Sequence, residues 1–204
     1  AVLSCVITML CWGSWANTQK LVQNKWRFEL FYWDYSLGIF FISLLGAFTM
    51  GSFGEAGRSF VPDLLQADSS NMINALIGGI VFNLANILLT AAIANAGMAV
   101  AFPIGIGIAL IIGVLINYLL LSKGNPVFLF SGVILVTAAI ILNAWAYKIY
   151  AGPVQKKNVS KWVVISLVAG VLMSTFYSFV ASSMDLENFV TPAPGKMTPY
   201  SAFV

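Results

Sequence analysis

Two asparagines lie close together near the middle of a long apolar stretch of this chain. Asn83 and Asn86 are three positions apart, and positions 69–122 contain no Asp, Glu, Lys or Arg. On a helix this spacing puts both carboxamides on one face, where their donors and acceptors suit a neutral polyhydroxyl or ureido ligand. The alternative is hydrogen bonding between helices, which contributes about 0.6 kcal/mol on average in a membrane. We favour a polar cavity.

Two tryptophans in the first apolar stretch offer a flat surface to the same kind of ligand. Trp12 and Trp15 would form an aromatic wall for a sugar ring or a planar heterocycle. The alternative is anchoring at the membrane boundary, where Trp is enriched, and the residue types leave both readings open. Asn117 and Tyr177 are further lining candidates, the latter because it takes the place of Trp15 in a later apolar stretch.

Asp34 is the one acidic residue well inside an apolar stretch. Burial in lipid would disfavour its charged form, so an unpaired carboxylate here would take up and release a proton during a transport cycle. The alternative is a structural ion pair with a nearby cation such as Lys20. His is absent, which removes the commonest general base and metal ligand. We therefore expect no metal site, no cofactor, no catalytic residues and no enzymatic activity.

The elements that position these residues must be membrane helices. The chain is 60% hydrophobic and 8% charged, whereas a soluble domain has roughly 25% charged residues, so a soluble domain and a nucleic-acid surface are excluded. A bilayer core takes roughly 20 helical residues to cross. The fold class is therefore all-α, a polytopic membrane helix bundle. The expected spans are about 1–20, 29–53, 70–94, 98–121, 127–147 and 162–184, with a seventh starting near Pro199.

The longest apolar stretch must divide, because 69–122 is far too long for one crossing. We expect the division at Asn95-Ala96-Gly97. From there a small residue recurs at every fourth position, a spacing that lets helix backbones approach closely. The residues of this small-residue stripe are Gly97, Ala101, Gly105, Ala109 and Gly113.

The distribution of basic residues predicts the orientation. The loops after the first, third and fifth spans hold seven of the ten Lys and Arg residues. Cytoplasmic loops carry the excess of Lys and Arg, so we expect the N-terminus outside and the basic loop 148–161 in the cytoplasm.

A weak internal repeat suggests how the chain is organised. Val2-Leu3-Ser4-Cys5-Val6 resembles Val164-Ile165-Ser166-Leu167-Val168, and Tyr35-Ser36 recurs as Tyr200-Ser201. Five spans per unit would insert the second unit upside down, and inverted repeats are a transporter architecture with the substrate bound near the midplane. We expect a first five-helix repeat over 1–147, the loop 148–161, and the start of a truncated second repeat over 162–204.

Three segments carry a resemblance to a known group of transporters. The segments Cys11–Lys20, Phe31–Tyr35 and Gly78–Asn86 resemble bacterial members of the drug/metabolite transporter superfamily, of the ureide permease, L-rhamnose–proton symporter and glucose/ribose porter types. This resemblance implies ten helices in two inverted five-helix repeats, a bacterial inner membrane and proton-driven uptake of a small polar solute. The chain would then be an N-terminal fragment. It lacks the long charged central loop of plant ureide permeases, which disfavours a ureide as the solute.

The sequence therefore predicts a secondary transporter of a sugar or ureide that is coupled to protons. Its partners are a small solute, protons and the lipid bilayer, and the oligomeric state is not predicted. The alternatives are an exporter of drugs or amphipathic metabolites, and a non-transporting membrane scaffold or sensor. The expected substrate-binding residues are Trp12, Trp15, Asn83, Asn86, Asn117 and Tyr177, with Asp34 as the proton-coupling residue.

Overall fold

The computed structural model describes residues 2–22, 25–53, 57–121, 125–150 and 159–204, and this part of the chain is almost entirely helical. Five helices are long and apolar enough to cross a membrane, which confirms the expected helical membrane bundle. The helices, in chain order, are α1 (Val2–Val22), α2 (Phe28–Phe48), α3 (Phe60–Gln66), α4 (Ser69–Ala96), α5 (Met98–Leu121), α6 (Pro126–Tyr150), α7 (Val159–Ser183) and α8 (Pro199–Phe203).

The first expected span differs from the other five. Helix α1 has 21 residues, enough to cross a bilayer core at 1.5 Å per residue. It is nevertheless absent from the helices that are apolar enough to span. The physical reason is its second half, where the polar residues Asn17, Thr18, Gln19 and Lys20 follow one another.

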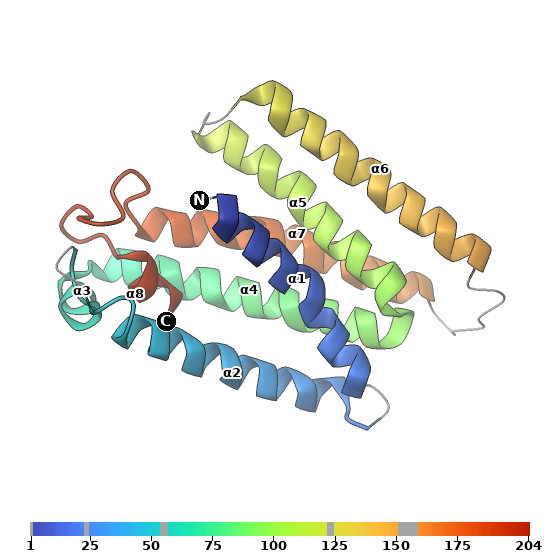
Figure 1. Ribbon diagram of the computed structural model, residues 1–204, viewed down its shortest axis with the longest axis horizontal. Helices are drawn as coiled ribbons and strands as arrows, with labels where there is room; N and C mark the ends of the chain where they lie inside the picture. Colours follow the sequence, from blue (N-terminus) through green and yellow to red (C-terminus); the bar gives the residue numbers. More distant parts are fainter. Residues whose placement is uncertain (1, 23–24, 54–56, 122–124, 151–158) are drawn as a thin grey trace.

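The long helices run back and forth between two ends of the bundle (Figure 1). The α1–α2 turn, the α4–α5 junction and the start of α7 lie at one end, on the right of that view. Helix α3 and the loop between α7 and α8 lie at the other. Lys20, Lys25 and Lys161 therefore lie at the same end of the bundle, as the distribution of Lys and Arg among the loops predicted. Lys123, Lys156 and Lys157 lie outside the described residues.

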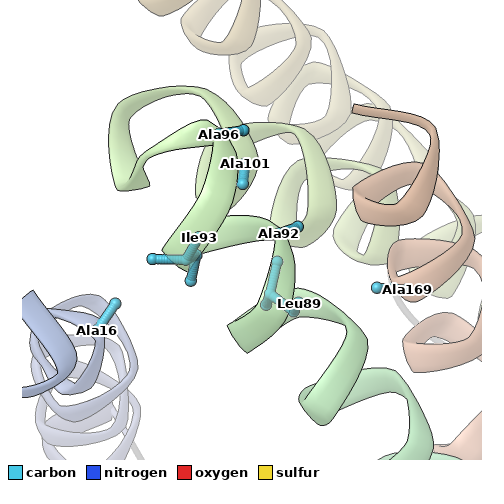
Figure 2. Close-up of a cluster of buried hydrophobic side chains, with 7 residues drawn as sticks. All are labelled: Ala16, Leu89, Ala92, Ile93, Ala96, Ala101 and Ala169. Carbon is cyan, nitrogen blue, oxygen red and sulfur yellow. The ribbon is translucent and has the colours of Figure 1, made fainter. Parts of the chain in front are cut away.

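Helices α4, α5 and α7 form the closely packed centre of the bundle, and buried alanines and branched side chains meet there (Figure 2). A Cβ atom on Gly170 of α7 would lie 2.5 Å from the backbone oxygen of Gly105 on α5. The hydroxyl of Ser166 donates a hydrogen bond to the carbonyl of Ala101. The small-residue stripe is thus a packing surface at Ala101 and Gly105, whereas a Cβ on Gly113 would meet nothing within 4 Å.

The division of the long apolar stretch lies where the sequence predicted it. Gly97 separates α4 from α5 with a φ of 93°, a conformation that favours glycine because it has no Cβ. Its N–H donates to the carbonyl of Ile93 and closes the last turn of α4. Helix α8 begins at Pro199, where the seventh span was expected. The two-repeat organisation remains a prediction.

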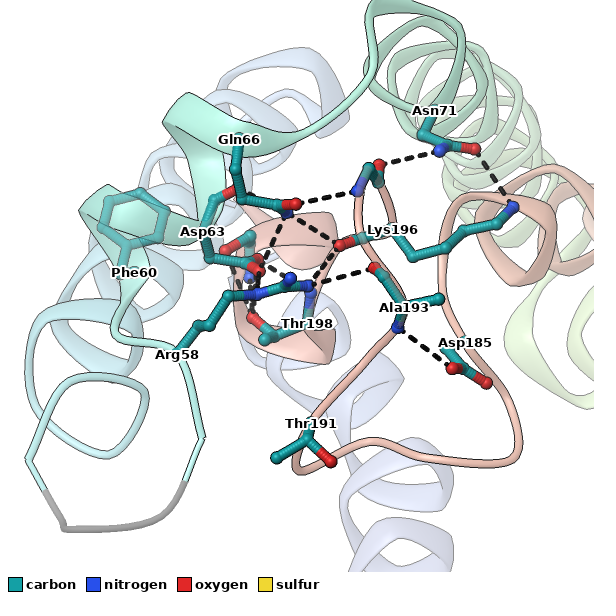
Figure 3. Close-up of polar contacts among 12 residues, drawn as sticks. Arg58, Phe60, Asp63, Gln66, Asn71, Asp185, Thr191, Ala193, Lys196 and Thr198 are labelled. Carbon is teal, nitrogen blue, oxygen red and sulfur yellow. Dashed lines mark hydrogen bonds and ion pairs between the residues drawn. The ribbon is translucent and has the colours of Figure 1, made fainter.

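A polar cluster at the other end of the bundle was not predicted. The carboxylate of Asp63 on α3 is fully buried and accepts hydrogen bonds from Arg58 Nε at 2.9 Å and from the backbone N–H of Thr198 at 2.8 Å. Thr198 in turn caps the N-terminus of α8. Asp63 therefore joins α3 to the start of α8, although the two lie far apart in the sequence (Figure 3).

Gly195 closes the same cluster. Its N–H donates to Gln66 Oε1 at 2.8 Å, and its carbonyl accepts from Asn71 Nδ2 at 2.8 Å. Gly195 has a φ of +80°, and a Cβ here would lie 2.1 Å from Asp68 Oδ2. Only glycine satisfies both the conformation and the space, so the loop before α8 is held against the start of α4.

Candidate solute-binding site

A cavity of about 630 Å³ opens between α1, α2, α4, α7 and the end of the chain. We call it the solute cavity. Four of the six predicted substrate-binding residues line it: Trp12, Trp15, Asn83 and Asn86. The structure thus brings together the aromatic pair of the first helix and the carboxamide pair of α4.

Two aromatic rings form one wall of the solute cavity. Trp15 of α1 stacks on Tyr35 of α2, with ring centroids 5.4 Å apart and an interplanar angle of 28°. Both rings line the cavity. A planar solute would find here a flat apolar surface with a hydroxyl group at its edge.

The carboxamide of Asn86 meets this wall. Its Nδ2 donates to the Tyr35 hydroxyl at 3.4 Å, and the side chain is only 2% exposed. No donor among the described residues reaches Asn86 Oδ1. Asn86 therefore presents a hydrogen-bond acceptor at a site lined by aromatic rings.

The carboxamide of Asn83 is fixed by its neighbours. The Tyr32 hydroxyl lies 2.9 Å from Asn83 Oδ1 and 3.0 Å from its backbone oxygen, within donating distance of both. Asn83 Nδ2 donates to the carbonyl of Gly79 at 3.1 Å. One N–H of this amide remains for a ligand, so Asn83 complements Asn86 as a donor.

Asn117 and Tyr177 line a different cavity, of about 560 Å³, between α1, α5 and α7. Trp12 lines both cavities. The Phe82 ring lies 6.3 Å from the Trp12 ring and 4.9 Å from the Phe176 ring, measured between centroids. This aromatic partition separates the two groups of predicted lining residues, which the sequence had placed in one site.

Asp34 lines neither cavity. It is exposed on α2 and makes no ion pair with Lys20, the alternative that the sequence left open. The reason is helical geometry. Tyr32 and Tyr35 face the solute cavity and α4, so the residues between them turn outward, as the 68% exposed Trp33 does. A proton-coupling role for Asp34 remains a prediction.

Two tyrosines of α2 were not predicted as site residues, although Tyr35 lines the solute cavity and Tyr32 holds the Asn83 carboxamide. Tyr32 and Tyr35 belong to a stripe of α2 that continues with Ser36, Ile39 and Ser43 at helical spacing. This helical periodicity is visible in the sequence, and it places Tyr35 rather than Asp34 at the cavity. Within the described residues, no group of three or more His, Cys, Asp or Glu side chains is placed to hold a metal ion.

Comparisons with known proteins relate this chain to ureide permeases. The family model described as "Ureide permease" matches residues 31–166. Probable ureide permease A3 of Vigna unguiculata is 29% identical over 192 residues, which cover 92% of this chain and 50% of that protein. Ureide permease 5 of Arabidopsis thaliana is 26% identical over 164 residues, which cover 77% of this chain and 40% of that protein. No solved structure matches.

The chain thus spans half or less of the length of these curated relatives. The relatives are plant proteins, so they give no support to the expected bacterial inner membrane. The absence of a long charged central loop disfavoured a ureide in the sequence analysis, yet the ureide permease family model matches this chain. Because the family match covers about two thirds of the sequence, this chain belongs to the ureide permease family.

Proposed function

We propose that this chain forms part of a permease that carries a small, planar, hydrogen-bonding solute of the ureide class across a membrane. The observation that carries the proposal is the meeting of the Trp15–Tyr35 stack with the carboxamide of Asn86 at one wall of the solute cavity. The relatives are named as ureide permeases, which supports the same class of solute.

The chemistry of the site suits a ureide. A ureido group is flat, carries N–H donors on both sides of a carbonyl, and has no charge. Its face would lie against the Trp15–Tyr35 stack, one N–H would donate to Asn86 Oδ1, and its carbonyl would accept from Asn83 Nδ2. A site built to hydrogen-bond such groups rejects analogues that lack them, because its own buried polar atoms would be left unpaired.

A sugar remains the second candidate for the solute cavity. Carboxamides serve hydroxyl groups as well as N–H groups, and aromatic rings also stack on sugar rings. The discriminating feature is the acceptor at Asn86 Oδ1 beside a flat wall, which favours a planar solute with N–H donors.

An exporter of amphipathic metabolites has one observation in its favour. The cavity between α1, α5 and α7 is lined mainly by apolar side chains, among them Phe102, Ile106 and Leu110. Trp12 and Phe176 line both cavities, so the two share a wall. A non-transporting scaffold or sensor would bind solute in neither cavity and would move none.

Proton coupling and orientation belong to the proposal as well. Asp34 is the candidate proton carrier, although it lies outside the solute cavity. The N-terminus is proposed to face outside, because the end of the bundle that carries Lys20, Lys25 and Lys161 has the basic loops expected of the cytoplasmic side. Arg58 and Lys196 at the opposite end are engaged in hydrogen bonds with protein oxygens.

Uptake of a radiolabelled ureide into cells that express the full-length protein tests the proposal. The variants are Trp15→Ala and Asn86→Leu. The matched control is Asn143→Leu, since Asn143 is exposed on α6 and its Nδ2 donates to Ala139 of the same helix. We expect uptake to fall about tenfold or more in the first two, as for loss of about 1.4 kcal/mol of binding, and to stay near the wild-type rate in the control. Equal uptake by all four proteins would refute the proposed site.

A further inference from the structure

Two adjacent glycines of α4, Gly78 and Gly79, line the solute cavity about one helical turn before Asn83. Their surroundings differ. A Cβ atom on Gly78 would lie 2.5 Å from Val180 Cγ2 and 3.2 Å from the backbone oxygen of Phe176, whereas a Cβ on Gly79 would meet no described residue within 4 Å. Gly78 therefore allows α4 to pack closely on α7, and Gly79 does not serve that contact.

Backbone conformation does not explain the glycine at position 79 either. Gly79 lies within α4 and has no left-handed φ, and glycine inside a helix is less stable than alanine. An alanine would fit there without a clash and would stabilise α4. The absence of a side chain at this position therefore points to the cavity rather than to the fold.

The carboxamide of Asn83 lies over Gly79. Side chains of a helix lean toward its N-terminus and cover the preceding turn, and Asn83 Nδ2 donates to the carbonyl of Gly79 at 3.1 Å. The second N–H of this amide is the donor proposed above for a solute carbonyl. A solute that accepts from it must lie beside Gly79, in the space that a side chain at position 79 would fill.

The part of the solute cavity near Gly79 is lined mainly by apolar side chains. Ala75 precedes Gly79 by one turn of α4, and Ile39 and Phe40 follow the Tyr35 wall by about one turn of α2. Within the described part of the chain, no Asp, Glu, Lys or Arg side chain lines this cavity. An apolar group placed here would be removed from water, which favours its binding.

The volume of the solute cavity agrees with a solute larger than a bare ureido ring. Its volume is about 630 Å³, and cavities of roughly 300–1,000 Å³ take drug-sized ligands. A small cyclic ureide on the Trp15–Tyr35 wall would leave part of this space empty. The space beside Gly79 can hold the rest of the molecule.

We infer that Gly79 determines the specificity of the solute cavity, and that the solute is a ureide with an apolar substituent next to the carbonyl that Asn83 binds. The ureido group lies against the Trp15–Tyr35 stack and donates to Asn86, while the substituent fills the space beside Gly79. The inference rests on the proposed function, because it takes the solute to be a ureide.

Equilibrium dialysis tests this inference with radiolabelled hydantoin, a cyclic ureide, and the full-length protein in lipid nanodiscs. Unlabelled 5-isobutylhydantoin, which carries an apolar group next to a ring carbonyl, is the competitor. Wild type should bind the competitor at least as tightly as hydantoin. In Gly79→Val, whose added atoms stay close to Cβ and therefore beside Asn83, affinity for the competitor should fall about tenfold more than affinity for hydantoin.

Two further variants separate selectivity from stability. Gly79→Ala favours the helix and adds only Cβ, so it should shift the ratio of the two affinities in the same direction by a smaller factor. Gly38→Val is the matched control, because Gly38 is exposed on α2, does not line the solute cavity, and has no described residue within 4 Å of an added Cβ. It should leave the ratio unchanged.

The outcomes distinguish this inference from the proposed function. Wild type that binds hydantoin but not 5-isobutylhydantoin would overturn the role of Gly79 and leave the solute cavity standing. The same holds if Gly79→Val and Gly79→Ala weaken both compounds equally or not at all. Wild type that binds neither compound would overturn the proposed function, and this inference with it.

Discussion

The Asn86 carboxamide on α4 donates a hydrogen bond to the Tyr35 hydroxyl on α2 across 3.4 Å. This contact joins the polar group of α4 to the aromatic wall formed by α1 and α2, since Tyr35 also stacks on Trp15 of α1. The contact therefore orients the Asn86 carboxamide. With Nδ2 held by Tyr35, the acceptor oxygen of Asn86 is the atom left to meet a solute.

Tyr35→Phe tests that consequence. The change keeps the ring, and with it the stack on Trp15, but removes the hydroxyl that holds Asn86 Nδ2. We expect ureide affinity to fall about twofold to thirteenfold, the range for one net hydrogen bond of about 0.5–1.5 kcal/mol. Isothermal titration gives the dissociation constant. Tyr35→Ala should lose more, because it removes the stack as well, and equal losses in the two variants would contradict an orienting role for the hydroxyl.

Asp63→Ala should destabilise the bundle strongly. The change leaves Arg58 and the backbone N–H of Thr198 without their buried partner, and breaking a buried pair in this way costs roughly 3–5 kcal/mol. Thermal unfolding in detergent measures the loss. Arg27→Ala is the control, because it breaks the exposed ion pair to Glu29, whose partners are 79% and 42% exposed. Similar shifts of Tm in the two variants would show that the contacts of Asp63 stabilise the bundle no more than the exposed Arg27–Glu29 ion pair does.

Asp185 should make the loop before α8 sensitive to acid. Backbone N–H groups of Ala193, Glu187 and Asn188 hydrogen-bond its carboxylate and hold the pKa of Asp185 below its usual value. A lowered folded-state pKa stabilises the loop above the unfolded value of about 3.9, and this contribution is lost as the pH falls through the folded pKa. Protection of the Ala193 amide from hydrogen exchange, corrected for the intrinsic rate, should therefore fall in acid. In Asp185→Asn it should be low already at neutral pH and change little in acid.

Gly170→Ala should weaken the packing of α7 on α5. The new Cβ would lie 2.5 Å from a backbone oxygen of Gly105, which cannot move aside as a flexible side chain would, and overpacking of this kind costs about 1–3 kcal/mol. Gly132→Ala on α6 is the matched control, because nothing lies within 4 Å of its added Cβ. That change should stabilise its helix by about 0.5–1 kcal/mol. Chemical denaturation in mixed micelles compares them, and a Gly170→Ala protein as stable as wild type would contradict the close approach.

Asp34→Asn tests proton coupling. If Asp34 carries the proton, ureide uptake by the full-length variant should lose its dependence on external pH while binding persists. The exposed position of Asp34 outside the solute cavity makes binding an independent readout. Unchanged pH dependence of uptake in this variant would remove Asp34 from the mechanism.

The sequence predicted those features that depend on local composition. Apolar length set the helices, Gly97 set the break between α4 and α5, and helical periodicity brought Trp15 and Asn86 to one cavity. What it did not predict depends on distant partners. Helix α3 and the loop before α8 owe their structure to Asp63, Gln66 and Gly195, polar residues whose pairing crosses more than a hundred positions of the chain.

The sequence predicted least well which side chains of a helix face the cavity. A rotation of α2 by a single residue exchanges Asp34 for Tyr35 at the cavity, and one acidic residue in an apolar stretch does not reveal which way it points. Asn117 and Tyr177 were placed in one site with Asn86, because the partition by Trp12, Phe82 and Phe176 arises only when three helices meet.

Alkylation of the chain's own two cysteines gives the most direct test of the solute cavity. Cys5 and Cys11 are both free and exposed on α1, but only Cys11 lines the cavity. We would follow N-ethylmaleimide labelling of each cysteine by mass spectrometry of its peptide, in the full-length protein with and without a ureide. The expected result is that the ureide slows labelling of Cys11 and leaves Cys5 unchanged. Labelling of Cys11 at the same rate with saturating ureide, or equal slowing of both cysteines, would contradict a ureide bound between α1, α2 and α4.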